Sequence, residues 1–484
     1  MAARVGVRVR FTRWLLCTLV ALPLAALPLA AQESASSGAI TPTVSLRTRT
    51  ESWNWFGAGA GDDYAYSLIL LRAGLEQQRA HLGWRLEFSA PLVIGAPDDA
   101  TQGHGASYYR ANGERRIIAT LFPRQAFVRV GQQAVGHRLK LGRFEFSEGG
   151  EVSPANPTLA ALKRRSVVQR LIGPFNFTQG ARSLDGFEYG WSRRGLNVTV
   201  LGAVPTVGVF NLDGWSSVPE IPVGYAAVTG PGPWTPSRGE WRIFAVAFGD
   251  RRGLVKADNR PLALRQTDRE AIAITTLGAH LLRVVLTRAG PLDFAAWGAS
   301  QFGSWGTQSH RAGAMDVEAG WQPAGVRWNP WLRVGVFASS GDADPSDGRH
   351  GTFFQTLATP RLYARFPFYN LTNVRDWQAG VTLRPGRRLT LRGDVRLLQL
   401  GNSADGWYTG SGPFDDSAFG IGIRPSAGSR ALGTLTDLSA DFQWSRHWTL
   451  AAYGSLAHAG AAIRASTPGA TTGSFAFLEL EYRR

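Results

Sequence analysis

The chain has 484 residues and a formal net charge of +16, with 49 Arg and only 3 Lys on the basic side. Aromatic side chains are plentiful (17 Trp, 25 Phe and 11 Tyr) and charged residues make up only 18%, a composition that excludes long disorder. A disulfide scaffold is excluded because Cys17 is the only cysteine. The mean hydropathy of −0.11 is too low for a bundle of membrane helices.

Residues 1–31 have the layout of a secretory signal peptide. A basic start with four arginines precedes an apolar run from Trp14 to Ala31, and small residues close it. Cleavage is expected near residues 30–32, with an uncleaved anchor helix as the alternative. Removal takes four arginines and no acid, which leaves +12 on residues 32–484. Beyond them no uncharged apolar run reaches the roughly 18 residues that a membrane helix needs.

Alternation of apolar and polar side chains predicts β-strands through the rest of the chain. In a strand, successive side chains face opposite sides, so a period of two marks one apolar and one polar face. In chain order, the clearest runs are 82–89, 187–191, 332–338, 389–397, 437–444 and 476–482. No helical period of 3.6 is comparably strong, so the chain is predicted to be all-β.

Short turns and long loops are also expected to alternate. Hairpins with short turns are predicted at 187–200, 377–397 and 438–456, and the Gly-, Pro-, Ser- and Asp-rich segments 98–118, 204–240, 339–360 and 401–432 are expected to be long loops. This pattern is typical of outer-membrane barrels. A soluble sandwich is the alternative, but the export signal, the many long strands and the lack of a domain linker favour the barrel. We predict that residues 32–484 form a single transmembrane antiparallel β-barrel of 16–18 strands, with short periplasmic turns and long extracellular loops.

Several stretches resemble the alginate-export family of outer-membrane porins. They are Leu141-Gly142-Arg143-Phe144-Glu145-Phe146-Ser147, residues 338–345 with 352–357, and Asp405-Gly406-Trp407-Tyr408-Thr409-Gly410-Ser411-Gly412, in an order that covers the chain from about residue 40 to its end. The resemblance implies an 18-stranded barrel with a positively charged constriction that passes an anionic polysaccharide. Two departures stand out: Arg164-Arg165-Ser166 lacks the family's usual Phe-Asp-Gly continuation, and the chain ends in Tyr482-Arg483-Arg484 rather than in the aromatic residue that the barrel-assembly machinery reads.

Arginines are the candidate binding residues, because a planar guanidinium that stays charged suits carboxylates. Nine arginines have the parity of the polar strand face, but so do nine acidic residues, so a lumen of mutually neutralising ion pairs is the competing interpretation. The excess charge lies elsewhere: residues 103–143 carry +7, residues 158–182 carry +5 and residues 349–375 carry +4. These stretches are interpreted as a basic constriction folded partly into the lumen, or alternatively as extracellular loops that bind surface glycans. The predicted pore arginines are Arg47, Arg49, Arg85, Arg124, Arg129, Arg143, Arg164, Arg165, Arg170, Arg361, Arg365 and Arg392.

Other candidate sites are weaker. Asp342, Asp344 and Asp347 lie in a Gly-rich loop and offer hard oxygen ligands for Ca²⁺, but they lack a full calcium-loop pattern and a solvated loop is favoured. His310 and His447 stand near serines without a third group or a nucleophile motif, so a hydrolase is disfavoured and no enzyme activity or cofactor is expected.

The sequence leads to a channel in the outer membrane of a Gram-negative-type bacterium, passing an anionic polysaccharide or small organic anions without covalent chemistry. The alternative is a non-conducting adhesin or structural barrel that binds ligands through loops 204–240 and 401–432. Expected partners are outer-membrane lipid, the transported anion and the barrel-assembly machinery, with periplasmic export partners left open. Nucleic acid is not expected as a partner.

Overall fold

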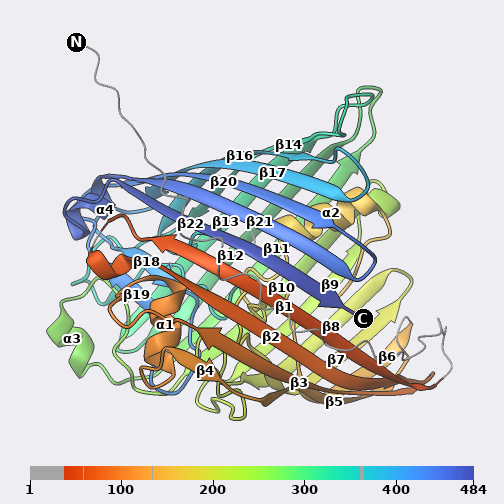
Figure 1. Ribbon diagram of the computed structural model, residues 1–484, viewed down its shortest axis with the longest axis horizontal. Coiled ribbons are helices and arrows are strands. Elements are labelled where there is room, and N and C mark those ends of the chain that lie inside the picture. Colours follow the sequence, from red (N-terminus) through yellow and green to blue (C-terminus); the bar gives the residue numbers. More distant parts are fainter. Residues whose placement is uncertain (1–37, 58, 133–134, 360–364) are drawn as a thin grey trace. The chain divides into compact units, whose positions relative to one another are not determined.

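Eighteen antiparallel strands close into a barrel in the computed structural model, which describes residues 38–57, 59–132, 135–359 and 365–484 (Figure 1). Closure is made by the first and last strands, which pair from Ser45 opposite Arg483 to Asn54 opposite Ser474. The barrel strands are β1 (Ile40–Asn54), β2 (Asp63–Gln78), β3 (Leu82–Ile94), β5 (Phe122–Gly131), β6 (Gly136–Phe144), β7 (Leu184–Arg193), β8 (Leu196–Pro205), β9 (Val223–Pro231), β10 (Gly239–Asp250), β11 (Ile272–Val285), β12 (Leu292–Trp305), β13 (Gln308–Trp321), β14 (Trp331–Ser339), β16 (Val374–Leu383), β17 (Leu389–Leu400), β20 (Ala431–Gln443), β21 (Trp448–Ala459) and β22 (Thr472–Arg483). The predicted all-β barrel and the favoured strand number are confirmed.

The remaining elements lie in the connections. Four short strands are β4 (Ile117–Ala119), β15 (Arg349–His350) and the separate hairpin of β18 (Trp407–Gly410) with β19 (Ile421–Arg424). The helices are α1 (Gly103–Ala111), α2 (Pro157–Ser166), α3 (Leu262–Thr267) and α4 (Ala461–Ser466), with 3-10 turns η1 (Ala60–Asp62) and η2 (Pro236–Arg238). No helix in the described part of the chain is long and apolar enough to cross a bilayer.

The two ends of the barrel differ in their connections. At one end, the turn end, the strands are joined by 79–81, 132–135, 194–195, 232–238, 286–291, 322–330, 384–388 and 444–447. At the other, the loop end, the connections reach 27 residues in 95–121, 39 in 145–183, 34 in 340–373 and 30 in 401–430, although 306–307 is a tight turn. The expected contrast between short turns and long loops is therefore present.

Strand alternation explains the two faces of the wall. Leu438, Ile243 and Val334 are about 60% exposed on the outside, whereas Leu435 and Leu282 on the opposite parity are fully buried. Outward apolar side chains repeat around the barrel, which is the arrangement that a lipid-facing wall requires. Lumen-facing positions can therefore be assigned strand by strand.

One expected loop is wrong. Residues 204–240 contain β9, which pairs with both β8 and β10, and the connection that follows it is the short turn 232–238. The outward positions of β9 include Gly224 and Ala226, and prolines bracket the strand at Pro222 and Pro231. In other strands the alternation is visible because the outward residues are large and apolar. In β9 the small outward residues and the flanking prolines hide it.

The loops fold into the loop end of the barrel and form its hydrophobic core. Trp53 and Phe475 at the loop ends of β1 and β22 pack with Phe366, whose ring lies 6.1 Å from that of Trp53. Phe175 and Phe210 from two other loops belong to the same buried cluster. Burying such a side chain contributes roughly 1.5–3 kcal/mol, so the cluster fixes the loops in the barrel mouth.

Candidate functional site

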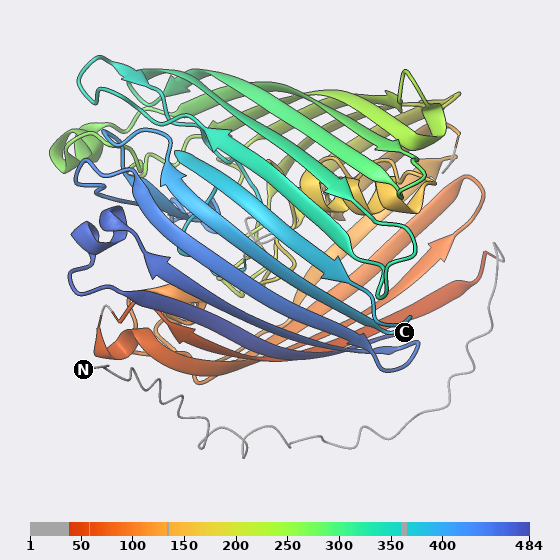
Figure 2. The same cartoon turned by 90° about the horizontal axis from the view of Figure 1, so that it is seen from above.

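The connection between β6 and β7, residues 145–183, crosses the lumen and is called here the constriction segment. It forms ion pairs with β10, β13 and β17, and Arg47 of β1 donates hydrogen bonds to its far end. These strands lie on different sides of a closed ring, so the segment must pass through the interior. In Figure 2, α2 of this segment lies within the ring of strands.

The local sequence explains why the segment contains a helix at α2. Asn156 caps the helix by accepting a hydrogen bond from the Leu159 backbone N–H at 3.0 Å, and Pro157 occupies the first turn. Leu159 and Leu162 are buried, and α2 packs against β11 and β12. The basic run at 163–165 falls in the last turn, where the helix dipole favours positive charge.

Acidic side chains of the barrel wall anchor the basic residues of the constriction segment. Lys163 Nζ lies 2.7 Å from Glu240 Oε1 of β10, and Arg165 Nη2 lies 2.7 Å from Asp394 Oδ1 of β17. Arg170 pairs with Asp316 of β13 at 2.5 Å. The first and third pairs are almost fully buried, whereas the side chain of Arg165 keeps 18% exposure. The helix and the residues after it therefore lie against an acidic wall and pair with three of its carboxylates.

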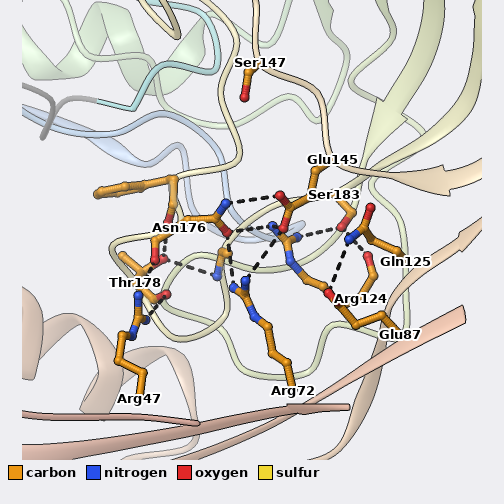
Figure 3. Close-up of polar contacts among 12 residues, drawn as sticks. Arg47, Arg72, Glu87, Arg124, Gln125, Glu145, Ser147, Asn176, Thr178 and Ser183 are labelled. Atoms are coloured by element: carbon orange, nitrogen blue, oxygen red, sulfur yellow. Dashed lines mark hydrogen bonds and ion pairs between the residues drawn. The ribbon is translucent and has the colours of Figure 1, made fainter. Parts of the chain in front are cut away.

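The far end of the segment meets the opposite wall at Asn176 (Figure 3). The Asn176 side-chain oxygen accepts from Arg72 Nη2 at 3.2 Å and from Arg124 Nη2 at 3.0 Å, while its Nδ2 donates to Glu145 Oε2 at 3.1 Å. Arg47 Nη1 donates to the Asn176 backbone oxygen at 2.7 Å. Three arginines from β1, β2 and β5 thus converge on one asparagine, two on its side-chain oxygen and one on its backbone oxygen, and we call these five residues the Asn176 cluster.

Neighbouring contacts hold this end of the segment in place. Arg47 also donates to the Thr178 backbone oxygen and to the Gln179 side chain. Arg49 pairs with Glu479 at 2.5 Å and stacks on Phe177, with its guanidinium carbon 3.8 Å from the ring centroid. Carbonyl oxygens are uncharged acceptors, so these contacts of Arg47 hold the segment without adding a negative charge.

The lumen-facing charges are segregated around the barrel. In the described strands from β1 to β7, eight basic side chains face the lumen: Arg47, Arg49, Arg72, Arg85, Arg124, Arg129, Arg138 and Lys140. The four acidic ones are Glu51, Glu76, Glu87 and Glu188. We call this half of the wall the basic wall.

The other half of the wall has the opposite balance. From β8 to β22, five basic side chains have lumen parity: Arg242, Arg333, Arg392, Arg396 and Arg483. Eleven are acidic: Glu240, Asp250, Asp293, Asp316, Glu318, Asp376, Asp394, Asp437, Asp441, Glu479 and Glu481. Three cations of the constriction segment, Lys163, Arg165 and Arg170, pair with this acidic wall, whereas the basic wall has twice as many cations as anions.

Seven of the predicted pore arginines are paired with carboxylates. They are Arg49, Arg85, Arg124, Arg143, Arg165, Arg170 and Arg392. Arg47 lies 3.7 Å from Glu479 in addition to its carbonyl contacts. Arg361 lies outside the described residues.

Three predicted arginines have no carboxylate within ion-pair distance among the described residues: Arg129, Arg164 and Arg365. Arg164 is exposed on α2, and Arg365 lies over the Phe477 ring at 5.3 Å. No described carboxylate therefore offsets the charge of these three side chains at ion-pair distance.

Arg143 differs from the expectation of a pore residue. It pairs with Ala126 of β5 and Asp185 of β7 on the parity of exposed Val128 and Phe187, which is the outer face. Its guanidinium binds both Asp185 oxygens and the Gly214 and Trp215 carbonyls. Strand β6 has too few strong alternations for the sequence alone to have fixed this parity.

The sequence analysis missed several members of the site. Arg72 is not among the predicted pore arginines, and Asn176 and Glu145 carry no functional signal in the sequence. The acids Glu240, Asp316 and Glu318 that anchor the segment lie in strands whose parity was not assigned. A signal existed for these acids, because 314–320 alternates small or acidic residues with Met315 and Val317.

The candidate calcium and hydrolase sites do not assemble. Asp344 accepts from Ser346 and Asp347 from the Arg349 backbone, whereas Asp342 is buried against Asp405 and Thr352. No group of three His, Cys, Asp or Glu side chains within the described ranges could hold a metal ion. Burial and the nearby Asp405 raise the pKa of Asp342 to about 6.

The histidines considered for hydrolysis have other contacts. His310 bonds to His350, and His447 bonds to the Arg483 backbone oxygen. Neither of these hydrogen bonds joins the histidine to a serine, so the arrangement of a nucleophile beside its base is not formed by these contacts.

Comparisons with known proteins agree with this architecture. A family model described as Alginate export matches residues 169–477, which is more than half of the chain. No curated protein sequence matches.

Solved porins share the fold at low identity. A BenF-like porin from Pseudomonas fluorescens Pf-5 is 9% identical, with 92% of this chain and 98% of that chain covered and a TM-score of 0.57. Acinetobacter baumannii OccAB4 is 8% identical over 92% and 98%, with a TM-score of 0.56, and Pseudomonas aeruginosa OccK9 (OpdG) is 12% identical over 91% and 98%, with a TM-score of 0.55. Together with the match to the family model, the closed barrel and its lumen-crossing segment lead to one conclusion: this chain is an outer-membrane β-barrel of the alginate export family, a family of channels.

Proposed function

We propose that the channel passes anions, either an anionic polysaccharide or small organic acids, along its basic wall. The observation that carries this proposal is the segregation of charge. An evenly paired lumen would favour neither sign, but here three cations of the constriction segment pair with the acidic wall, and on the other side eight cations face four anions. A surplus of one sign in a narrow, low-dielectric passage raises the local concentration of the opposite ion.

Carboxylates are the anions that this lumen suits best. Arginine presents planar pairs of donors that match a carboxylate, and only one lysine, Lys140, lies on the basic wall. Passage is passive in this proposal and no bond is made or broken. The family description, Alginate export, names a polymer of carboxylate-bearing sugars, which supports the same class of substrate without fixing its identity.

Neutralising the three unpaired cations should reduce anion selectivity. In the variant with Arg129→Gln, Arg164→Gln and Arg365→Gln, the chloride-to-potassium permeability ratio from reversal potentials in planar bilayers should fall about three- to tenfold. The matched control changes Arg311, Arg349 and Arg375 to Gln. These are exposed, and Arg311 shares the outward parity of Met315 and Val317. This control should leave the ratio almost unchanged.

Two results of the bilayer recordings would contradict the proposal. A cation-selective wild-type pore would overturn the proposal. A folded barrel without conductance would favour the loop-binding adhesin instead.

We also propose that residues 1–31 direct export and are removed. They lie outside the described residues, and their basic and apolar regions support the proposal. Mass spectrometry of the protein purified from outer membranes should find a chain that begins near residue 32. An intact Met1 would instead support the anchor-helix alternative.

A further inference from the structure

Glu145 is the one carboxylate of the Asn176 cluster, and its side chain is partly exposed. It is the first residue after β6, and 24% of its side chain is exposed, compared with 18% for Arg72 and 1% for Arg124. Although burial raises the pKa of Glu145, Arg124 and Arg72 lower it below its ordinary value, so the group is ionised at neutral pH. The cluster therefore holds one anion at its accessible edge.

The contacts of this carboxylate define a complete binding site. Arg124 Nη2 lies 2.6 Å from Oε1, Arg72 Nη1 lies 3.9 Å from the same oxygen, and Asn176 Nδ2 donates to Oε2 at 3.1 Å. Two guanidinium groups and one amide thus surround a carboxylate. The Asn176 amide is oriented by the two arginines, which both donate to its oxygen.

The frame of this site does not depend on Glu145. Arg124 Nη1 donates to Ser183 Oγ at 2.6 Å, and the Ser183 hydroxyl donates back to the Arg124 backbone oxygen at 2.6 Å. Arg47 holds the backbone of Asn176 independently. If the Glu145 side chain turned toward the water of the lumen, Arg72, Arg124 and Asn176 would keep their positions and offer an empty carboxylate site.

We propose that this is an exchange site, in which a carboxylate of the transported molecule takes the place of the Glu145 carboxylate and Glu145 returns as it leaves. The proposal deepens the proposed function, on which it rests, by naming the chemical group that is recognised and the residue that releases it. Conduction requires binding strong enough to admit a solute and weak enough to let it go. A tethered competitor supplies the second condition, because its effective concentration at the site is in the millimolar range or above.

Removing the competitor should lengthen the stay of a carboxylate in the pore. In the Glu145→Gln variant, the residence time of a uronic acid trisaccharide, measured from single-channel blocking events, should rise about tenfold over wild type. Glu76→Gln is the matched control, because Glu76 is 43% exposed, faces the lumen and makes the same charge change at a different arginine, Arg85. A general electrostatic effect would lengthen both residence times equally.

A second variant separates exchange from damage to the fold. Adding Arg72→Gln to Glu145→Gln should abolish the gain, and a neutral trisaccharide of the same size should show no gain in either variant. Equal residence times in Glu145→Gln and Glu76→Gln, in a pore that remains anion-selective, would overturn the exchange site and leave the proposed function intact. A wild-type channel that shows no preference for anions would instead overturn the proposed function itself.

Discussion

Replacing Arg182 with Met should open the loops that fill the barrel mouth. Arg182 is 2% exposed and donates to four backbone carbonyls, those of Gly173, Leu357, Ser411 and Pro413. These oxygens belong to three different loops, so one guanidinium joins the constriction segment, 340–373 and 401–430. Burial and the nearby Arg124 lower the pKa of Arg182, but the group keeps its charge at neutral pH.

Local stability should fall because methionine cannot replace the hydrogen bonds that the charged Arg182 guanidinium donates. Bonds to a charged donor contribute about 1.5–3 kcal/mol each, and the carbonyls left behind stay buried, so local stability should fall by roughly 3 kcal/mol or more. Hydrogen exchange of the Gly173 and Leu357 amides, which bond to Leu357 and Leu171, should accelerate about 100-fold. The noise of the open-channel current should also rise, because loosened loops would move in the barrel mouth.

The control for this prediction is Arg116→Met. Arg116 pairs with Asp98 at 3.0 Å, but the two side chains are 62% and 48% exposed, and such pairs contribute little. Exchange in the loops should stay at the wild-type rate. If Arg182→Met left exchange at Gly173 and Leu357 unchanged, the hydrogen bonds of Arg182 would not contribute to loop stability.

The sequence predicted the barrel because strand parity is a local property. Runs such as 389–397 and 437–444 showed both faces directly, and the structure pairs them as β17 and β20. Strand β9 was missed for an equally local reason, since Gly224 and Ala226 provide no large outward side chain. The pattern therefore fails where a wall is built from small residues.

The candidate site was harder to predict because it depends on which strands face each other. In the sequence, the polar strand faces carry equal numbers of acidic residues and arginines. In the structure, the acidic and basic side chains that face the lumen are also nearly equal in number when the whole ring is counted. The segregation between β1–β7 and β8–β22 appears only when the ring is closed and Arg165 or Arg170 can be matched with an acid more than 140 positions away. Such partners carry no local signal.

A pair of buried histidines at the loop end leads to the last prediction. His350 of β15 lies on β13, with its Nδ1 2.9 Å from His310 Nδ1, and its ring stacks on Trp305 at 4.2 Å. His310 Nε2 faces the side-chain oxygen of Gln301, whose amide nitrogen donates to Thr276 and Phe354. His310 must therefore donate from Nε2 and accept at Nδ1.

In this arrangement a further proton on either imidazole would have no hydrogen-bond acceptor. His350 donates from Nδ1, and its buried Nε2 has no hydrogen-bond partner. Four charged groups of the adjacent β10–β11 loop, residues 251–271, pair with one another: Lys256, Asp258, Arg260 and Asp268. Burial, His310 and Arg260 hold the pKa of His350 well below its ordinary value. Because the unfolded segment takes up this proton more readily, the docked state loses stability as the pH falls below about 6.5.

Acidification from pH 7 to pH 5 should therefore release residues 349–357 from the barrel mouth. Amide exchange at Phe353 and Phe354, corrected for its intrinsic pH dependence, should accelerate at least tenfold, because His310 and His350 can both take up a proton in the released state and each such proton adds up to a factor of ten per pH unit below about 6.5. Asp342 acts in the opposite direction, because a pKa raised to about 6 stabilises the docked state as that carboxyl is protonated. The double variant His310→Gln with His350→Phe keeps a ring on Trp305 and removes both imidazoles, so it should show only the Asp342 effect and exchange no faster at pH 5. Acid release that persists in this double variant would assign the pH response to another group.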